Sequence, residues 1–432
     1  MQETPTAPAP AGQGRRTRLI AAIVGILVAL VAIAAVYSLS LGPAGSANVV
    51  TLGFSISLTG RYSVEGTNSL NGILTAQNWI NTHGGITIGG KSYQLSLKYY
   101  DDTSASSQIV PLYTRIITND GANALLAPYS SALTSAAAPL ADQLDRVMLS
   151  HGGSSDTIWT TAPGYRNLVM VLSPASTYLK GAVDWIKLNH PSDKIAVVHE
   201  SDSFSTTAAK SAIAYAGSLG INVVYNKSYP SSPPDLTPLL TAAQAAGADD
   251  LIGGGHFQDG LLIVNQLNSI GWKPKFVSLL VAVTEHSFRD QLGGLSNNVT
   301  GPSQWESSVA YGPALAQSLG LSWFGPTPAE FTSLYANVTH GLAPTYHSGE
   351  AAASTLLVAK AMETANSFNT SAIRQVLAQM NVMNFFGRFQ VTAAGLQAAH
   401  TMVVVQWQAG SLKVVWPTPV ANAPLQYPYT AS

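Results

Sequence analysis

The 432-residue sequence contains no cysteine. This absence excludes disulfide bonds, thiolate metal sites, a cysteine nucleophile and a lipid-modified N-terminal cysteine. Charged residues make up only 10% of the chain, well below the roughly 25% of an ordinary soluble domain. The formal net charge is −1, so we expect no basic surface that would attract a nucleic acid. Serine, threonine, asparagine and glutamine must therefore supply much of the polar surface.

Signatures of catalysis are scarce as well. The chain has no G-x-S-x-G nucleophile elbow. Residues 84–92 mimic a phosphate-binding loop, but they follow a predicted helix and precede a predicted strand, which is the wrong order for such a loop. We interpret them as a hairpin-like turn. His151, His256 and His347 do not lie at a close ligand spacing such as i, i+4. We therefore expect no enzyme, no metal and no cofactor.

The N-terminal region has a composition of its own. Residues 1–18 are rich in proline, alanine and glycine, end in three arginines, and are expected to form a disordered cytoplasmic segment. Residues 19–41 carry no charge and are long enough to cross a hydrocarbon core of about 30 Å. The arginines orient everything after this run outward. The run is longer than a usual signal core of about 7–15 residues, which favours a retained single-pass membrane anchor. A signal cleaved near residues 43–47 is the alternative.

From residue 49 onward, strand-like and helix-like segments alternate. In the first half, strands are predicted at 49–57, 93–100, 124–127 and 147–149, with helices at 69–83, 105–119 and 133–144. The pattern restarts with strands at 194–199, 221–225, 250–253 and 276–281 and helices at 178–188, 205–219, 236–246 and 261–270. Strands separated by helices of this length form parallel sheets. The sequence therefore predicts an α/β protein with two doubly wound parallel-sheet lobes.

The last third of the chain follows a different pattern. Residues 302–328 are rich in glycine, proline and serine and predict a crossover loop. Helices are expected at 329–338 and 348–367, and a terminal hairpin at 401–408 and 411–416.

Hydroxyl-bearing and glycine residues follow the predicted strands. Ser130 and Ser131 come after the third strand, and Gly152 and Ser154 come after the fourth. Ligands of open α/β sheets bind beyond the carboxyl ends of the strands. There, backbone N–H groups and serine hydroxyls can hold a carboxylate. The alternative is that these residues only cap helices and form turns.

Several stretches in these regions resemble the leucine/isoleucine/valine-binding-protein family. They are GFSISLTGRYSVEGTNSLNG (53–72), HGGITIGGKSYQLSLKYYDDTSA (83–105), APYSSALTSAAAPLAD (127–142), MLSHGGSSD (148–156), KIAVVHESDSFS (194–205), GGGHFQDG (253–260) and MVVVQWQAGSLKVVWP (402–417). Their order from residue 49 to residue 417 carries the resemblance, because no single motif is diagnostic.

The resemblance implies a type I periplasmic-binding fold, in which a three-crossing hinge joins two lobes. Lobe one would comprise residues 49–173 and 308–384, and lobe two residues 174–307 and 385–420. It also implies an extracellular or periplasmic protein that captures a small polar solute and presents it to the permease and ATPase subunits of an ABC importer. A ligand-sensing receptor ectodomain of the same fold is the alternative.

Site residues also follow from the resemblance. Ser130, Ser131, the Gly152 backbone and the Ser154 hydroxyl would hold a ligand carboxylate, and Tyr129 beside them is a further candidate contact. Phe204 stands where the family has an aromatic residue that covers the ligand from lobe two. Glu65 lies near a cleft aromatic of the family, and His256 lies in a lobe-two loop that contacts ligand.

One departure concerns the ligand itself. Amino acid binders of the family pair the α-ammonium with an acidic residue just after the strand that corresponds to residues 276–281, and here Leu279 and Leu280 stand at that place. A buried ammonium without an anionic partner would lose several kcal/mol. The possible substitutes are Glu65, Asp202, Asp259 and Glu285. Otherwise the solute is a relative of the amino acids, such as an amide.

Overall fold

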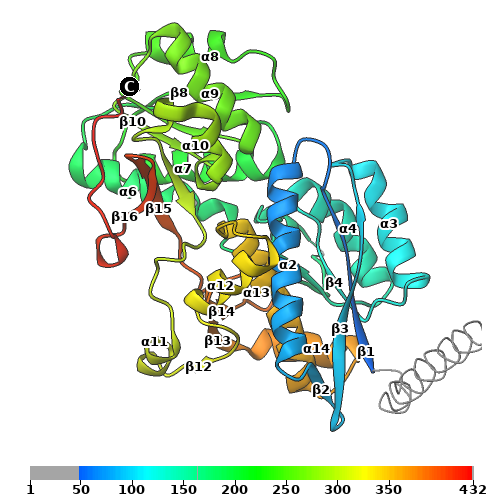
Figure 1. The fold of residues 1–432 in the computed structure, drawn as a ribbon. Coiled ribbons are helices and arrows are strands. Elements are labelled where there is room, and N and C mark those ends of the chain that lie inside the picture. The colour runs from blue at the N-terminus through cyan, green and yellow to red at the C-terminus, as the bar shows by residue number, and fades with distance from the viewer. Residues whose placement is uncertain (1–47, 163, 431–432) are drawn as a thin grey trace, which may run out of the picture. The chain divides into compact units, whose positions relative to one another are not determined.

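The computed structural model describes residues 48–162 and 164–430, of which residues from Val49 onward form one α/β unit (Figure 1). The predicted cytoplasmic segment 1–18 and the predicted anchor 19–41 lie outside the described residues. Within the described ranges, no helix combines the length and apolarity that crossing a membrane requires.

The first sheet has six strands in the order β2-β3-β1-β4-β5-β6. These are β1 Val49–Ile56, β2 Ile86–Ile88, β3 Lys91–Asp101, β4 Ala124–Leu126, β5 Met148–Ser150 and β6 Leu168–Met170. All neighbouring strands are parallel except β2 and β3, which form an antiparallel hairpin. Gly89 and Gly90 both have positive φ at its turn, as tight hairpins require. The hairpin-like turn predicted for residues 84–92 is therefore confirmed.

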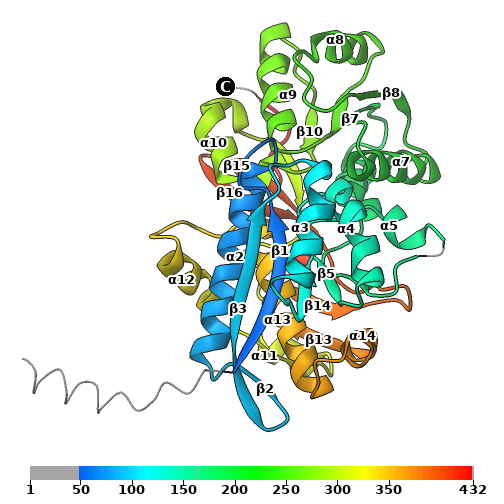
Figure 2. The same ribbon diagram turned by 90° about the vertical axis from the view of Figure 1, so that its right-hand side faces the viewer.

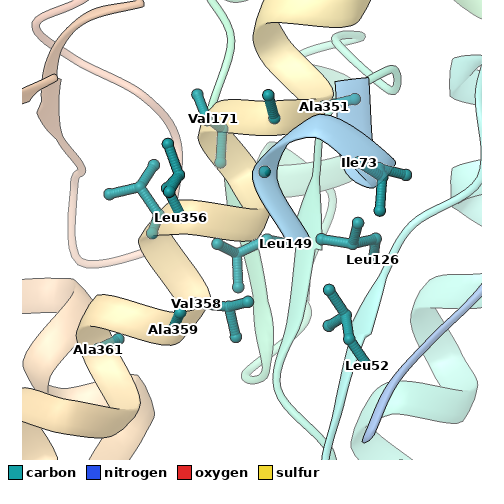
Figure 3. Packing of buried hydrophobic residues seen from close by; sticks show 14 of the residues in the cluster. Leu52, Ile73, Leu126, Leu149, Val171, Ala351, Leu356, Val358, Ala359 and Ala361 are labelled. Atoms are coloured by element: carbon teal, nitrogen blue, oxygen red, sulfur yellow. The ribbon is translucent and has the colours of Figure 1, made fainter. Parts of the chain in front are cut away.

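Helices cover both faces of this sheet (Figure 2). They are α2 Ser63–Thr82, α3 Ser106–Thr118, α4 Ser131–Gln143, α5 Thr157–Thr160, α12 Pro328–Val338, α13 Tyr346–Ala365 and α14 Thr370–Gln379. Helix α13 lies against α2, and a Cβ at Gly72 would come within 2.1 Å of the Ser348 carbonyl oxygen. Glycine is therefore needed for this close approach. Figure 3 shows Leu52, Leu126 and Leu149 of the sheet facing α13 across the apolar core.

The second sheet has seven strands in the order β16-β15-β11-β10-β9-β7-β8. They are β7 Ile195–Glu200, β8 Val223–Tyr229, β9 Asp250–Gly254, β10 Phe276–Leu279, β11 Thr300–Ser303, β15 Val403–Gln408 and β16 Ser411–Trp416. The five strands from β8 to β11 are parallel, and the predicted terminal hairpin, β15 with β16, adds to the β11 edge in antiparallel orientation. Its helices are α6 Lys180–Asn189, α7 Ser203–Ser218, α8 Thr237–Ala245, α9 Phe257–Ile270 and α10 His286–Leu292.

The chain passes between the two sheets three times: between β6 and α6, after β11, and before β15. We call the first sheet with its helices lobe one and the second sheet with its helices lobe two. This is the predicted pair of doubly wound lobes. The predicted crossover at 302–328 also contains helix α11 Pro313–Ser318 and strand β12 Ser322–Trp323.

The last passage comes later than the predicted boundary after residue 384. Strands β12, β13 (Asn381–Asn384) and β14 (Gly387–Gln390) form a small third sheet. Phe385, Phe386 and Phe389 are buried in the apolar core of lobe one. Residues 385–391 thus stay with lobe one because their aromatic side chains complete its core. The three strands are two to four residues long, too short to show a clear periodicity in the sequence.

Candidate functional site: the cleft between the lobes

The strand order of each sheet reverses at one point. In lobe one, β1 has β3 on one side and β4 on the other, and in lobe two β7 lies between β8 and β9. Open α/β sheets bind ligands at such points, outside the carboxyl ends of the strands. The loops that follow β4 and β9 meet there, where the Tyr129 hydroxyl lies 3.1 Å from His256 Nδ1. The two lobes therefore face each other through their expected binding edges.

A small enclosed space lies between these loops. It is lined by Tyr129, Gly152, Ser154, Leu172, Tyr178, Phe204, His256, Val281, Tyr346, His347 and Glu350. Five of the eight predicted contacts are thus brought together, namely Tyr129, Gly152, Ser154, Phe204 and His256. The space measures about 10 Å³, roughly the volume of one water molecule. The lobes are therefore closed on each other, and a solute of amino acid size needs them to part before it can enter.

Ser130 and Ser131 begin helix α4 beside this space. Ser130 has φ +81°, and its hydroxyl oxygen caps the helix by accepting from the Leu133 N–H at 3.3 Å. Ser130 therefore caps α4 in this arrangement, and its contact with a ligand stays a prediction. The Ser131 hydroxyl oxygen accepts from the N–H groups of Ser154 and Ser155 at 3.1 and 3.0 Å. Two accepted bonds occupy both lone pairs and leave one O–H donor, which suits an anionic ligand group.

His256 forms the centre of the lobe-two side. Its Nε2 donates to Asp202 Oδ2 at 2.9 Å, and its Nδ1 donates to the Tyr129 hydroxyl. Burial disfavours the imidazolium, but the hydrogen bond and charge of Asp202 outweigh burial and raise the pKa of His256 to about 9. Burial opposes the Asp202 carboxylate too, yet His256 lowers the pKa of Asp202 to about 2. The two groups form a charged pair near neutral pH.

Phe204 and Tyr178 make the aromatic part of the cleft wall. Their rings meet edge to face with centroids 4.9 Å apart, and the Phe204 ring centroid lies 5.7 Å from that of His256. Phe204 is buried in the first turn of α7, where Asp202 caps the helix by accepting from the Ser205 N–H at 2.6 Å. The cap therefore sets the position of the ring beside the cleft.

Charged contacts tie the lobes together around the cleft. Arg61 of lobe one donates to both carboxylate oxygens of Glu200 in lobe two, at 2.7 and 2.6 Å. Asn68 of α2 donates to Glu285 at 2.6 Å. Glu65, fully buried in α2, accepts from the Phe257 N–H at 3.1 Å. Glu65 thus joins the lobes beside the enclosed space rather than lining it.

Three of these side chains lie close enough for a metal ion. Ligand atoms of Glu200, Asp202 and His256 are within 4.8 Å of one another. In this arrangement, however, Glu200 pairs with Arg61, and His256 uses one nitrogen for Asp202 and the other for Tyr129. We therefore assign no metal to these residues, and the absence of a metal site stays a prediction.

No acidic residue of lobe two among those suggested takes the place of the ammonium partner that is absent at positions 279 and 280. Leu279 and Leu280 are buried among apolar neighbours. The suggested substitutes all have partners already: Asp202 binds His256, Asp259 accepts from the His256 N–H, Glu285 binds Asn68 and His347, and Glu65 binds the Phe257 N–H. None of these four acids lines the enclosed space. Asp202 and Glu285 reach it only indirectly, because their partners His256 and His347 line it.

Glu350 is the acidic residue that the sequence argument missed. It lies in the first turns of α13, it is 1% exposed, and it lines the enclosed space. Neither of its carboxylate oxygens has a hydrogen-bond partner among the described residues. Burial raises the pKa of Glu350 well above its ordinary value. The sequence did offer a signal for Glu350. It directly precedes the uncharged, mostly apolar run AAASTLLVA (351–359), which is an unusual place for an acidic residue. Leu172, Tyr178, Val281, Tyr346 and His347 were also missed.

A larger surface groove of about 820 Å³ lies elsewhere on lobe one. Arg166 and Asn167, which precede β6, and Arg374 of α14 line it. The groove is therefore at the amino ends of the strands, where α/β sheets do not place their ligands. We assign the binding site to the cleft.

Two sheets that meet through the carboxyl ends of their strands, with both lobes contributing to one enclosed space, define a two-lobed binding protein. The chain matches the periplasmic binding protein family over residues 49–411 and belongs to that family. The resemblance to its leucine/isoleucine/valine-binding members is confirmed. The family comprises solute-binding proteins, not enzymes, so the chain is a binding protein that works outside the cytoplasm.

Individual relatives agree with this assignment. Leu/Ile/Val-binding protein homolog 7 of Brucella melitensis is 24% identical over 91% of this chain and 98% of its own. The fold is similar to that of the branched-chain amino acid transporter substrate binding protein LivJ from Streptococcus pneumoniae, with a TM-score of 0.72, 19% identity and coverage of 88% and 100%. An ABC transporter solute binding protein from Rhodopseudomonas palustris has a TM-score of 0.69, 17% identity and coverage of 84% and 95%.

Proposed function

We propose that this protein captures a small polar solute, an amino acid or a related compound, between its lobes and delivers it to an ABC importer. The observation that carries the proposal is the enclosed space between the lobes, which polar and aromatic side chains of both lobes line. The relatives support the solute class. The LivJ structure is a complex with isoleucine, and the Rhodopseudomonas structure is a complex with 3,4-dihydroxybenzoic acid. Both solutes are small and carry a carboxyl group.

The proposed site divides the work between the lobes. Ser131, Ser154 and the Gly152 backbone bind the ligand carboxylate on lobe one, while the lobes are open. Phe204 and His256 touch the ligand only after the lobes close around it. A contact made only in the closed state biases the open–closed equilibrium, and hinge closure of this kind is the behaviour that periplasmic binding proteins exemplify.

A membrane tether is the second part of the proposal. Residues 19–41 form an uncharged run that follows three arginines, so they anchor the binding unit to the outer face of the membrane. Sequencing of the mature N-terminus tests this: we expect Arg15 to Arg18 to be present and the protein to sediment with membranes. A mature N-terminus between residues 43 and 47 would contradict the anchor and indicate a cleaved signal.

A thermal-shift screen of the full chain in detergent tests the binding function. The screen covers amino acids, their amides, urea and aromatic acids. A true ligand at 100 times its dissociation constant adds about 2.7 kcal/mol to the free energy of unfolding. Co-purification with a permease and an ATPase supports the importer role, whereas a signalling partner in their place would indicate a receptor ectodomain. The absence of any stabilising solute would refute the function.

A further inference from the structure

Glu350 is a buried acid without a partner at the wall of the cleft. Its side chain is 1% exposed, and neither oxygen has a hydrogen-bond partner in the described part of the chain. More than about 90% of buried polar groups in native proteins are hydrogen-bonded. The Glu350 carboxyl group lacks the partner that most buried polar groups have, and the enclosed space beside it offers a place for one.

Three charged groups around the cleft already have side-chain partners, and Glu65 accepts from a backbone N–H through one of its two oxygens. Arg61 holds Glu200, His256 holds Asp202, and His347 donates to Glu285 at 2.5 Å. Glu350 is the one acidic residue among those that line the enclosed space. The protein therefore presents one unpaired carboxyl group to a ligand, and it does so from α13 of lobe one.

Aromatic rings surround the same space. Tyr129, Tyr178, Phe204 and Tyr346 line it together with Glu350. The faces of such rings attract a positively charged nitrogen, and more strongly when water is excluded. A buried carboxylate beside them adds a charge partner, which an ammonium group needs in a site without water. Rings and carboxylate thus select for the same chemical group.

We propose that Glu350 is a specificity-determining residue that pairs with a cationic nitrogen of the solute, so that the ligand is a zwitterion. Its carboxylate lies at Ser131 and Ser154, and its ammonium or alkylated ammonium lies between Glu350 and the aromatic rings. This inference rests on the proposed binding function. It assigns to α13 of lobe one the acidic partner that Leu279 and Leu280 do not supply on lobe two.

Matched ligands test the pairing directly. The full chain is titrated with leucine, phenylalanine and glycine betaine, and with 4-methylpentanoate and 3-phenylpropanoate, which lack the nitrogen. We expect at least one zwitterion to bind and its nitrogen-free analogue to bind about 10- to 100-fold more weakly, the effect of losing a hydrogen bond to a charged group. Glu350→Gln should weaken the zwitterion by a similar factor and leave the analogue within about twofold.

The control variant is Glu363→Gln, which makes the same change on the same helix, where Glu363 pairs with exposed Lys360 outside the enclosed space. It should bind like wild type. Glu350→Gln breaks no hydrogen bond within the described residues, so its melting temperature should equal or exceed that of wild type. Glu350→Met, an apolar side chain of similar size, is the second variant and should lose the zwitterion as well.

Calorimetry in two buffers of different ionisation enthalpy gives an independent readout. A buried carboxyl that is protonated in the ligand-free cleft must ionise to pair with a cation, so binding should release a proton. Other titratable groups face the same region, namely Glu65, Tyr129, Tyr178, His256, Glu285, Tyr346 and His347. Two variants identify the group that releases the proton. If it is Glu350, Glu350→Gln should abolish the release and Glu363→Gln should retain it.

The possible results distinguish failure of the Glu350 assignment from failure of the proposed binding function. Wild type that binds a nitrogen-free acid or an amide as tightly as the zwitterion overturns the assignment to Glu350 and leaves the binding function intact. So does a Glu350→Gln variant that keeps the wild-type affinity for the zwitterion. Failure of wild type to bind any solute of the wider screen overturns the proposed function itself.

Discussion

The ion pair between Arg61 and Glu200 should help to hold the closed state. It joins the lobes through two hydrogen bonds, at 2.7 and 2.6 Å, and the Glu200 side chain has no exposed surface while that of Arg61 is 21% exposed. Arg61→Ala leaves a buried carboxylate without its cation. The penalty falls on the closed state alone, because parting of the lobes gives Glu200 access to water.

The magnitude follows from the burial of the two partners. Breaking a fully buried pair by removing one member costs about 3–5 kcal/mol, and the partial exposure of Arg61 reduces this to about 2–3 kcal/mol. Apparent affinity scales with the population of the binding-competent state. Since about 1.4 kcal/mol corresponds to a factor of ten, Arg61→Ala should weaken ligand binding about 30- to 100-fold.

Small-angle scattering and calorimetry together measure this effect. Wild type with saturating ligand should be more compact than Arg61→Ala at an equal ligand concentration, and the double variant with Glu200→Gln should recover part of the lost affinity. Lys360→Ala is the matched control, because it removes a cation from an exposed pair worth at most about 1 kcal/mol. An Arg61→Ala protein that compacts as fully and binds as tightly as wild type would show that the ion pair does not hold the closed state.

Three further predictions concern the cleft. Ser131→Ala and Ser154→Ala should each weaken binding about ten- to hundredfold without unfolding the protein, and unchanged affinity by calorimetry in both would leave these serines a purely structural role. Phe204→Ala should leave the association rate intact and speed release in stopped-flow measurements, since the ring touches the ligand only after closure; release as slow as in wild type contradicts this. The raised pKa of His256, about 9, means that its stabilisation is complete below about pH 6.5 and is lost as pH rises through 9. The lowered pKa of Asp202, about 2, means that its stabilisation is lost only as pH falls below about 4 toward 2. Denaturant titrations should therefore show the unfolding free energy falling by about 1–3 kcal/mol between pH 6.5 and 9, and an equal slope in His256→Gln would exclude the pair as its source.

Much of the architecture could be predicted from the sequence because its causes are local. Strand β1 and helix α9 follow from hydrophobic periodicity over fewer than twenty neighbouring residues, and the turn at Gly89 and Gly90 follows from backbone freedom. The polar loops after β4 and β5 were found in the same way, since the carboxyl ends of parallel strands share one edge. Short elements such as β13 and β14 were missed, because four residues show too little periodicity and pair only through their tertiary partner.

The chemistry of the site was decided by tertiary structure. The contacts that define it join residues 54 positions apart for Asp202 and His256, 127 apart for Tyr129 and His256, and 139 apart for Arg61 and Glu200. The sequence determined by itself which side chains stand at the ends of the strands. It could not determine that Ser131 accepts from two backbone N–H groups while Glu350 remains without a partner. Those outcomes depend on which neighbours the packed lobes bring within about 3 Å, and that distance is set by the whole fold rather than by any local pattern.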